Sequence, residues 1–413
     1  MELKAGYKQT EVGVIPEDWD VQPLLKAVHI ANGQVNPKHE PYKSMILVAP
    51  DHIESSTGKL LSKKTAADQG AISGKYMFES GDIVYSKIRP YLRKAILADF
   101  SGLCSADMYP LKPAPWASGG YILAVILGHQ FTRYAESVSV RSGMPKINRA
   151  EMADFTIAVP PLPEQLAIGS VLADIDRLIR DLEFLIAKKR DIKQAAMQEL
   201  LTGTRRLPGL EGEWEVKKLG DSALLKARIG WQGLTTAEYL SSGNYFLVTG
   251  TEFESGYIAW NECHFVDEKR NKQDKYIQLR PRDILVTKDG TIGKVALVTG
   301  LPGPATLNSG IFVIRPLDNA FSPEFFYYLL CSQVFSGFLG QLAAGSTINH
   351  LYQKDFVSFL YRIPPTIEEQ AAIANILNDI DSELIALKIR LNKTRAIKQG
   401  MMQELLTGKI RLT

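Results

Sequence analysis

Apolar side chains recur at alternating intervals of four and three residues in two stretches of this chain. Every position of the first stretch is matched by an apolar residue 205 positions later. The two sets are Ile168, Leu172, Ile175, Ile179, Leu182 and Ile186, and Ile373, Leu377, Ile380, Leu384, Leu387 and Leu391. This spacing is the a/d pattern of a coiled coil, so it predicts two long helices whose apolar seams each meet a partner helix.

The residues that flank these stretches predict where the helices begin and end. Pro163 and Glu164 suit the first turn, where a missing N–H costs nothing and a carboxylate meets the positive end of the helix dipole. Gly203 suits the left-handed position that follows a helix, and the second copy runs in the same way from about Glu368 to Gly408. Each helix would hold about 38 residues and extend roughly 57 Å.

A helix of this length is too long to serve as the core of one small domain. This favours packing of the two apolar seams on each other. If a pseudo-two-fold axis relates the two halves, the helices are antiparallel. The alternative is that each helix packs only on its own globular half. Faithful repetition of the a/d residues favours the paired helices, because local packing does not require it.

The repeat continues into the regions between the helices, where identity is lower. The matching segments are Ile46-Leu47-Val48 with Phe246-Leu247-Val248, Asp82-Ile83 and Lys87 with Asp283-Ile284 and Lys288, and Ile147-Asn148 and Asp154-Phe155 with Ile348-Asn349 and Asp355-Phe356. A chain that carries two copies of one unit suggests a two-fold task.

Short strands and helices are expected in the two variable regions. The strands are Ser44–Val48, Asp82–Ser86, Ala95–Ala98, Tyr245–Val248, Asp283–Thr287, Lys294–Val298 and Gly310–Ile314, and the helices are Gly120–Val138 and Glu324–Leu339. We therefore expect an α+β fold with two globular domains separated by two long helices that form an antiparallel coiled coil, as an internal pseudo-two-fold repeat. The expected boundaries are 1–160, 161–204, 205–363 and 364–413.

Composition places few limits on function. The 413 residues are 45% apolar and 23% charged, as in soluble globular proteins, and exceed the size of one typical hydrophobic core. No N-terminal signal and no apolar run of about 18 residues is present, so a cytoplasmic protein without a membrane segment is expected. Cys104, Cys263 and Cys331 are few and far apart, which indicates buried free thiols. A net charge of +3 neither requires nor excludes nucleic acid.

Local charge points to nucleic acid more clearly. Both copies place a lysine after the same Asp-Ile strand, close to glycines or to further cations, which suits contacts with phosphates and base edges. The candidate DNA-binding residues are Lys87, Arg89, Arg93, Arg141, Lys146, Asn148, Lys288, Thr291, Lys294, Ser346, Asn349 and His350. The alternative for any one such cluster is a solvated surface.

Other motifs predict no chemistry. Cys263-His264 has no second ligand pair nearby, so no metal site is expected. Glu215-Val-Lys217 and Asp191-Ile-Lys193 match only the end of a nuclease acid-x-Lys motif. No glycine-rich nucleotide loop or methyl-donor pocket follows a strand. We expect no catalytic residues and no cofactor in this chain.

The order of these parts resembles the specificity (S) subunit of type I restriction-modification systems, HsdS. The resemblance rests on Pro160-Pro-Leu-Pro-Glu-Gln165, on a downstream helix that ends in Glu-Leu-Leu-Thr-Gly, and on the duplication of both. Asp283-Ile-Leu-Val and Gly290-Thr-Ile-Gly-Lys-Val295 also look like the target-recognition domains of that family. The first copy departs here, with Lys87-Ile-Arg89-Pro90 in place of the glycines, and Thr366-Ile367-Glu368 departs from the Leu-Pro pattern in the second.

The resemblance implies a non-catalytic subunit that binds double-stranded DNA. Regions 1–160 and 205–363 would be target-recognition domains, each reading one half of a bipartite asymmetric target. The conserved helices, 161–204 and 364–413, would set the spacer and dock two modification subunits that carry S-adenosylmethionine and methylate adenine. A restriction subunit, the motor-nuclease, would join for cleavage. The alternatives are a coiled-coil scaffold that binds only proteins, and a fused nuclease or methyltransferase with an unrecognised site.

Overall fold

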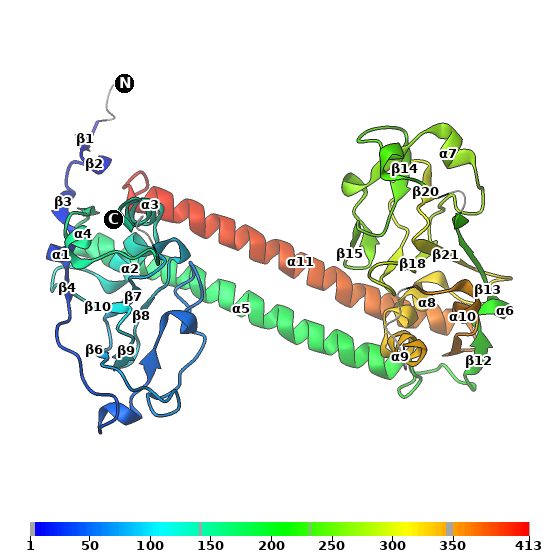
Figure 1. Cartoon of the computed structure of the whole chain (residues 1–413), viewed down its shortest axis with the longest axis horizontal. Helices are drawn as coiled ribbons and strands as arrows, with labels where there is room; N and C mark the ends of the chain where they lie inside the picture. The colour runs from blue at the N-terminus through cyan, green and yellow to red at the C-terminus, as the bar shows by residue number, and fades with distance from the viewer. Residues whose placement is uncertain (1–4, 140–142, 231–232, 344–349, 413) are drawn as a thin grey trace. The chain divides into compact units, whose positions relative to one another are not determined.

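The computed structural model describes residues 5–139, 143–230, 233–343 and 350–412. The chain divides into two compact units, which we describe separately. The first unit consists of Met1–Phe184 and Lys388–Thr413, and the second of Leu185–Leu387. Each unit therefore contains one globular region, part of the long helix α5 (Leu162–Leu200) and part of the long helix α11 (Ile367–Leu406) (Figure 1).

The globular region of the first unit is built from short strands and helices. They are β1 (Tyr7–Thr10), β2 (Gly13–Pro16), β3 (Asp20–Pro23), α1 (Leu24–Ala27), β4 (Val28–Ile30), β5 (Leu47–Val48), β6 (Tyr76–Phe78), β7 (Ile83–Ser86), β8 (Ala95–Leu97), β9 (Gly102–Cys104), β10 (Met108–Pro113), α2 (Gly119–Leu127), α3 (His129–Ser139), α4 (Arg149–Ala153) and β11 (Thr156–Val159).

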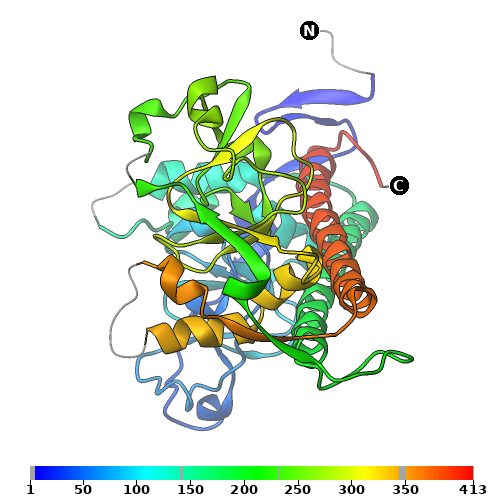
Figure 2. The same cartoon turned by 90° about the vertical axis from the view of Figure 1, so that its right-hand side faces the viewer.

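The second unit has elements of the same kinds (Figure 2). They are β12 (Glu215–Lys218), α6 (Leu219–Ser222), β13 (Ala223–Ala227), β14 (Tyr245–Val248), β15 (Phe253–Glu254), β16 (Tyr257–Ile258), β17 (His264–Val266), α7 (Glu268–Lys272), β18 (Ile284–Thr287), β19 (Val295–Leu297), β20 (Ala305–Leu307), β21 (Ile311–Pro316), α8 (Pro323–Leu330), α9 (Gln333–Leu342), α10 (Gln353–Phe356) and β22 (Leu360–Ile363).

The two globular regions share their main sheet and one strand pair of a smaller sheet. An antiparallel sheet of order β4-β10-β7-β8 in the first unit corresponds to β13-β21-β18-β19 in the second. A smaller sheet joins β5 to β9 in parallel, and β14 pairs with β20 in the same way. The pair β3–β11 precedes α5, and β12–β22 precedes α11. These equivalences confirm the α+β fold and the internal repeat.

Strand β7 and its counterpart β18 are buried along their whole length, because helices and the smaller sheets cover both faces. In the first unit Ile83 and Tyr85 face a core formed with α2, α3 and Trp19, while Val84 faces a second core around Phe78. The second unit repeats this division with Ile284 and Leu285. A run of apolar residues buried on both faces explains why these strands are visible in the sequence.

The long helices are antiparallel neighbours within each unit. In the first unit Lys398 Nζ lies 2.6 Å from Asp176 Oδ1. In the second unit Lys193 Nζ lies 2.6 Å from Asp381 Oδ1. These two ion pairs occupy equivalent repeat positions. All twelve a/d residues of the seams are buried or half-buried, which agrees with the antiparallel coiled coil of the predicted fold.

The helix ends also belong to the globular cores, contrary to the expectation that length would exclude them. Ile168 and Leu172 of α5 and Leu405 of α11 pack in the core of the first unit. Close packing of α2 on α5 depends on two glycines, because a Cβ on Gly120 would lie 3.2 Å from Gly169 Cα. The two proposed packings therefore coexist along each helix: the ends pack on a globular region and the seam packs on the other helix.

Several local predictions were wrong. The expected helix Gly120–Val138 is two helices divided at Gly128, and Glu324–Leu339 is likewise divided at Cys331 and Ser332. Only Leu47–Val48 of the expected segment Ser44–Val48 forms a strand, after a 3₁₀ turn. Cys331 is exposed, whereas the other two cysteines are buried as expected. Gly203 and Gly408 do adopt the predicted left-handed conformation, with φ of 72° and 67°.

One proposed repeat match is also wrong, by three residues. The backbone N–H of Ile147 donates to Lys87 O at 2.9 Å, and its counterpart is Leu351, which donates to Lys288 O at 2.8 Å. Phe155 O and Phe359 O both accept from the first residue of a short helix, α1 or α6. Asp154-Phe155 therefore corresponds to residues 358 and 359, and Asn148 corresponds to Tyr352, since the hydrogen-bond pattern defines the equivalence.

Candidate nucleic-acid interface

Lys87 and Lys288 occupy equivalent positions at the ends of the central strands β7 and β18. Each backbone N–H donates to a carbonyl before the neighbouring strand, Asp107 O at 3.0 Å and Gly310 O at 2.8 Å. Lys87 Nζ lies 5.2 Å from the ring centre of Tyr109. The corresponding distance from Lys288 Nζ to the Phe312 ring is 5.4 Å. Each lysine side chain is half-buried and ends in a charged amine next to an aromatic ring. The cation is therefore held at the surface in a restricted position.

A second segment of each globular region lies beside these lysines. In the first unit an isolated antiparallel bridge joins Ile88 to Lys146, and in the second unit one joins Asp289 to His350. Lys146 is exposed and His350 contacts the Asp289 carboxylate. The structure thus brings the candidates Lys146 and His350 next to the lysine-bearing turns.

Arg89 and Arg93 border the 3₁₀ turn Pro90–Leu92 and share a left-handed backbone conformation with φ of 48°. Arg89 is exposed, and its N–H donates to Pro145 O at 2.7 Å. Arg93 differs, because it lines a cleft and its Nε is buried without a hydrogen-bond partner among the described residues. Of these two candidates, only Arg89 has its backbone tied to the segment that carries Lys146.

Thr291 and Lys294 lie on a tight turn after Lys288. The hydroxyl of Thr287 donates to Thr291 O at 2.5 Å and accepts from the N–H of Lys294 at 3.0 Å. Gly293 permits the turn, with φ of 81° and a Cβ position only 2.4 Å from Leu339 Cδ1. The side chains of Thr291 and Lys294 are therefore presented on a fixed, exposed turn.

Asn148 has a structural role that the sequence analysis did not assign to it. It caps α4, because its Oδ1 accepts from the N–H of Glu151 at 2.9 Å. The side-chain NH₂ group is the part of Asn148 left for other contacts. The candidates Arg141, Ser346 and Asn349 lie outside the described residues.

The repeated Glu-Gln of the proline motif forms clamps that the sequence analysis missed. Glu164 is 4% exposed and binds Arg411 through Nε at 2.7 Å and Nη2 at 2.8 Å. Glu369 is 1% exposed and binds Arg206 through the same two nitrogens at 2.7 and 2.8 Å. Each arginine follows the end of the helix that does not begin with its glutamate. The sequence feature that could have indicated these ion pairs is an arginine three residues after Gly203 and another three residues after Gly408.

The neighbouring glutamines hold the globular regions to the helix starts. Gln165 Oε1 accepts from the N–H of Ser118 at 2.9 Å, and Gln370 Oε1 accepts from the N–H of Ser322 at 2.7 Å. These serines precede α2 and α8. A motif that satisfies buried polar groups in both units has a structural explanation and needs no ligand.

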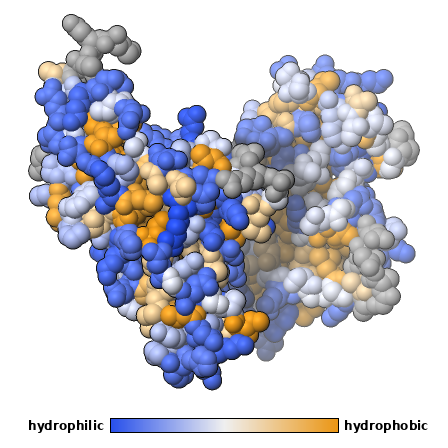
Figure 3. Space-filling view, turned by 60° about the vertical axis from the view of Figure 1, so that its left-hand side comes forward, coloured by the Kyte–Doolittle hydropathy of each residue, from blue (hydrophilic) through white to orange (hydrophobic). Residues whose placement is uncertain are grey.

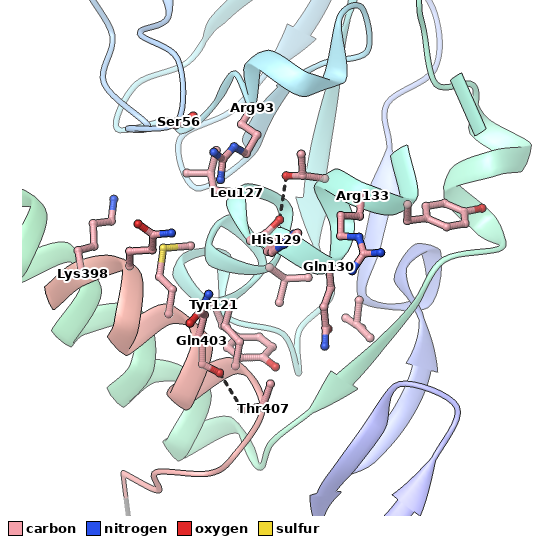
Figure 4. Close-up of a pocket in the computed structure, with 18 of the residues that line it drawn as sticks. Ser56, Arg93, Tyr121, Leu127, His129, Gln130, Arg133, Lys398, Gln403 and Thr407 are labelled. Carbon is pink, nitrogen blue, oxygen red and sulfur yellow. Dashed lines mark hydrogen bonds between the residues drawn. The ribbon is translucent and has the colours of Figure 1, made fainter. Parts of the chain in front are cut away.

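A cleft of about 1320 Å³ lies in the first unit between α3, the loop around Lys59, the middle of α5 and the C-terminal end of α11 (Figure 4). Glu183 Oε1 accepts from Arg395 at 2.7 Å, and Glu183 Oε2 accepts from Lys59 at 3.2 Å. Burial alone would raise the pKa of Glu183, but these hydrogen bonds outweigh burial and the pKa lies below its usual value. Two cations already balance the negative charge of the Glu183 carboxylate. Its contacts therefore suit a structural link between the loop and the helices better than an acid-base site.

Equivalent buried aspartates have different environments in the two units. Asp283 pairs with Arg315, whose Nη2 lies 2.6 Å from Asp283 Oδ2. At the equivalent of Arg315 the first unit has Lys112, which binds the exposed Glu79 instead. Burial therefore raises the pKa of Asp82, partly opposed by the backbone N–H of Glu79. This difference is a consequence of divergence between the repeats.

The described part of the chain offers neither a metal site nor a membrane-spanning helix. It contains no group of three or more His, Cys, Asp or Glu side chains placed to hold a metal ion. Within the same residues, no helix combines the length and the apolar character needed to cross a bilayer. The face of the first unit in Figure 3 is mainly hydrophilic, with small separate apolar patches.

Comparison with known proteins identifies the family. A family model described as the type I restriction modification DNA specificity domain matches residues 16–189 and again residues 211–394. The chain therefore belongs to the family of type I restriction-modification DNA specificity domains. Members of this family are the specificity subunits of such systems, so this chain is a specificity subunit and not an enzyme.

Named relatives agree with this assignment. The chain is 32% identical over 201 residues to the type I restriction enzyme EcoDI specificity subunit of Escherichia coli, a match that spans 48% of this chain and only 44% of that relative. It is 26% identical over 436 residues to the putative MjaX specificity subunit of Methanocaldococcus jannaschii, covering 98% and 97% of the two chains. The crystal structure of a type I S subunit from M. genitalium shares the fold, with a TM-score of 0.62 at 15% identity over 98% of both chains.

Proposed function

We propose that this chain is the DNA-recognition subunit of a type I restriction-modification complex, in which each globular region binds one half of a bipartite asymmetric target. The observation that carries the proposal is the equivalence of Lys87 and Lys288. Two divergent domains keep a surface cation over an aromatic ring at the same turn, where a phosphate can approach. Regions 1–160 and 205–363 are the proposed target-recognition domains.

The proposed partners dock on the helical regions, 161–204 and 364–413. In the first unit, Phe184 of α5 is 72% exposed and Ile389 of α11 is 63% exposed, and the two residues are repeat equivalents. Large apolar side chains at matching places on two helices suit contacts with two copies of one partner. We assign these partners as two modification subunits that supply S-adenosylmethionine, with a restriction subunit in the cleaving complex. This chain then needs no cofactor of its own, and a cytoplasmic complex provides access to DNA.

Methylation mapping tests the proposal most directly. Co-expression of this chain with its methyltransferase in a host that lacks other systems is expected to methylate adenines in one bipartite sequence. Lys87→Ala and Lys288→Ala should each weaken DNA binding and flatten its salt dependence by about one charge. Two exposed lysines, Lys26 in α1 and Lys218 at the end of β12, provide the matched controls Lys26→Ala and Lys218→Ala.

The result also separates the alternatives. A coiled-coil scaffold would bind the methyltransferase without sequence-specific DNA retention, and that outcome would exclude the proposal. Methyl transfer by this chain alone would instead indicate a fused methyltransferase.

A further inference from the structure

The first unit carries a second cation at the Tyr109 ring. Arg149, the first residue of α4, places its guanidinium carbon 5.7 Å from the ring centre, and Lys87 Nζ lies 5.2 Å from the same centre. Arg149 is not among the DNA-binding residues predicted from the sequence. Tyr109 is 6% exposed, so both cations lie against one aromatic ring whose position is fixed by burial.

Protein acceptors hold Arg149 in place. Its Nη2 donates to Ala31 O at 2.8 Å, its Nη1 donates to the side chain of Asn32, and Asn148 caps the helix on which it lies. These contacts use two of the five N–H donors of a guanidinium and leave three. Because both terminal nitrogens are engaged, the paired approach that reads a guanine edge is less suitable than a single contact to an oxyanion.

Among the residues that the structure describes, the two cations have no acidic counterpart. Within the part of the chain that the structure describes, no carboxylate lies within ion-pair distance of either Lys87 or Arg149. Two like charges at one ring repel each other, and an anion between them would relieve this repulsion. A phosphate group provides the charge and the several acceptor oxygens that such a pair can bind.

The second unit differs at the equivalent position. Gln353 is the first residue of α10, as Arg149 is of α4, and its Nε2 donates to Leu225 O at 3.2 Å. The nearby Arg228 does not replace Arg149, because it is 1% exposed. Its donors bind Leu307 O at 2.8 Å, Thr306 Oγ1 at 3.1 Å and Gln273 Oε1 at 3.1 Å. A phosphate at the surface would therefore meet Lys288 without a guanidinium beside it.

We propose that Lys87 and Arg149 together bind one backbone phosphate of the first half-target, and that Gln353 leaves the second reader with a weaker contact at the equivalent phosphate. This inference rests on the proposed function, since it assigns a contact within that DNA interface. Arg149 contributes affinity and register on the DNA, and it does not contribute to the choice of bases.

The test compares Arg149→Gln and Arg149→Lys with the wild type, each in complex with the methyltransferase and bound to duplex DNA that contains the mapped target. Arg149→Gln is expected to weaken binding several-fold at low salt. It should also reduce the slope of log K against log salt by up to about 0.9, the value for one phosphate contact. Arg149→Lys should keep most of that slope. The methylated sequence should be unchanged in both variants. Arg133→Gln, an exposed arginine of α3 that lines the cleft, is the matched control.

A second variant, which adds a contact, keeps the inference testable even if Arg149→Gln does not fold. Gln353→Arg is expected to steepen the salt slope and tighten binding through the second reader. An unchanged slope in both Arg149→Gln and Gln353→Arg, with wild-type binding intact, would overturn the inference while leaving the proposed function in place. A changed methylation sequence in Arg149→Gln would also overturn it, because that result indicates a base contact. Absence of sequence-specific binding by the wild-type complex would instead exclude the proposed function.

Discussion

Glu164 and Arg411 are 247 residues apart in the sequence and form a bidentate ion pair in the first unit, in which Glu164 is buried and Arg411 half-buried. The pair joins the start of α5 to the segment that follows α11. In the second unit Glu369 and Arg206 join the start of α11 to the segment that follows α5. In each unit, the glutamate at the start of one long helix therefore binds the arginine that follows the other long helix. This contact explains why the chain repeats both the Glu-Gln motif and the arginine after the glycine.

Removal of Arg411 should destabilise the first unit. Arg411→Ala leaves a carboxylate that is 4% exposed without its guanidinium, and loss of one partner from a buried pair costs about 3 kcal/mol. Urea denaturation followed by hydrogen exchange should show the loss in the β3–β11 pair. The control is Arg205→Ala, which removes a surface contact to Glu199 and should change the stability by less than about 0.5 kcal/mol. Equal stability of the two variants would contradict a stabilising role for the clamp.

The equivalent aspartates should respond in opposite ways to neutralisation. Asp283→Asn breaks the buried pair with Arg315 and is expected to cost about 3 kcal/mol at pH 7. Asp82→Asn should cost nothing or stabilise, because burial already disfavours the ionised form and raises the pKa of Asp82. Asparagine can still accept the hydrogen bond from Glu79 N–H. Thermal denaturation of the two variants at pH 7 provides the comparison.

The pH dependence of Asp82→Asn follows from the same shift. The folded-state pKa lies above the unfolded value, so the ionised carboxylate destabilises the fold at higher pH. This penalty disappears as the pH falls through the folded-state pKa. The advantage of Asp82→Asn over the wild type should therefore shrink on acidification. An advantage that grows as the pH falls would have the wrong sign for a raised pKa.

Charge placed in the helix seam should be more harmful than charge placed on the outer helix surface. Ile175 and Ile380 are half-buried seam residues, and their joint replacement by Asp should cost several kcal/mol and abolish DNA binding. Phe184→Asp with Ile389→Asp introduces the same charges at exposed positions. This second variant should keep its melting temperature and lose methyltransferase binding in pull-down assays. If the seam variant kept its stability, the paired helices would be excluded.

The sequence alone was sufficient for the long helices, the repeat and the central strands. A heptad pattern is a local property, so Ile168 to Ile186 and Ile373 to Leu391 could be recognised without knowledge of their partners. The left-handed glycines Gly203 and Gly408 were recognisable for the same reason. Strands β7 and β18 were found because burial on both faces leaves an uninterrupted apolar run.

Only the tertiary structure decided which distant side chains meet. Arg149 was not among the candidates predicted from the sequence, and only the fold brings it to the ring of Tyr109, a strand residue 40 positions earlier. The repeat match of Ile147 moved from Ile348 to Leu351 because hydrogen bonds, and not identity, define structural equivalence. The partners of Glu164 and Glu369 were likewise hidden, since an ion pair between remote segments leaves no periodic pattern in the sequence. Local periodicity therefore determined the elements, whereas long-range packing determined the clamps and the candidate DNA contacts.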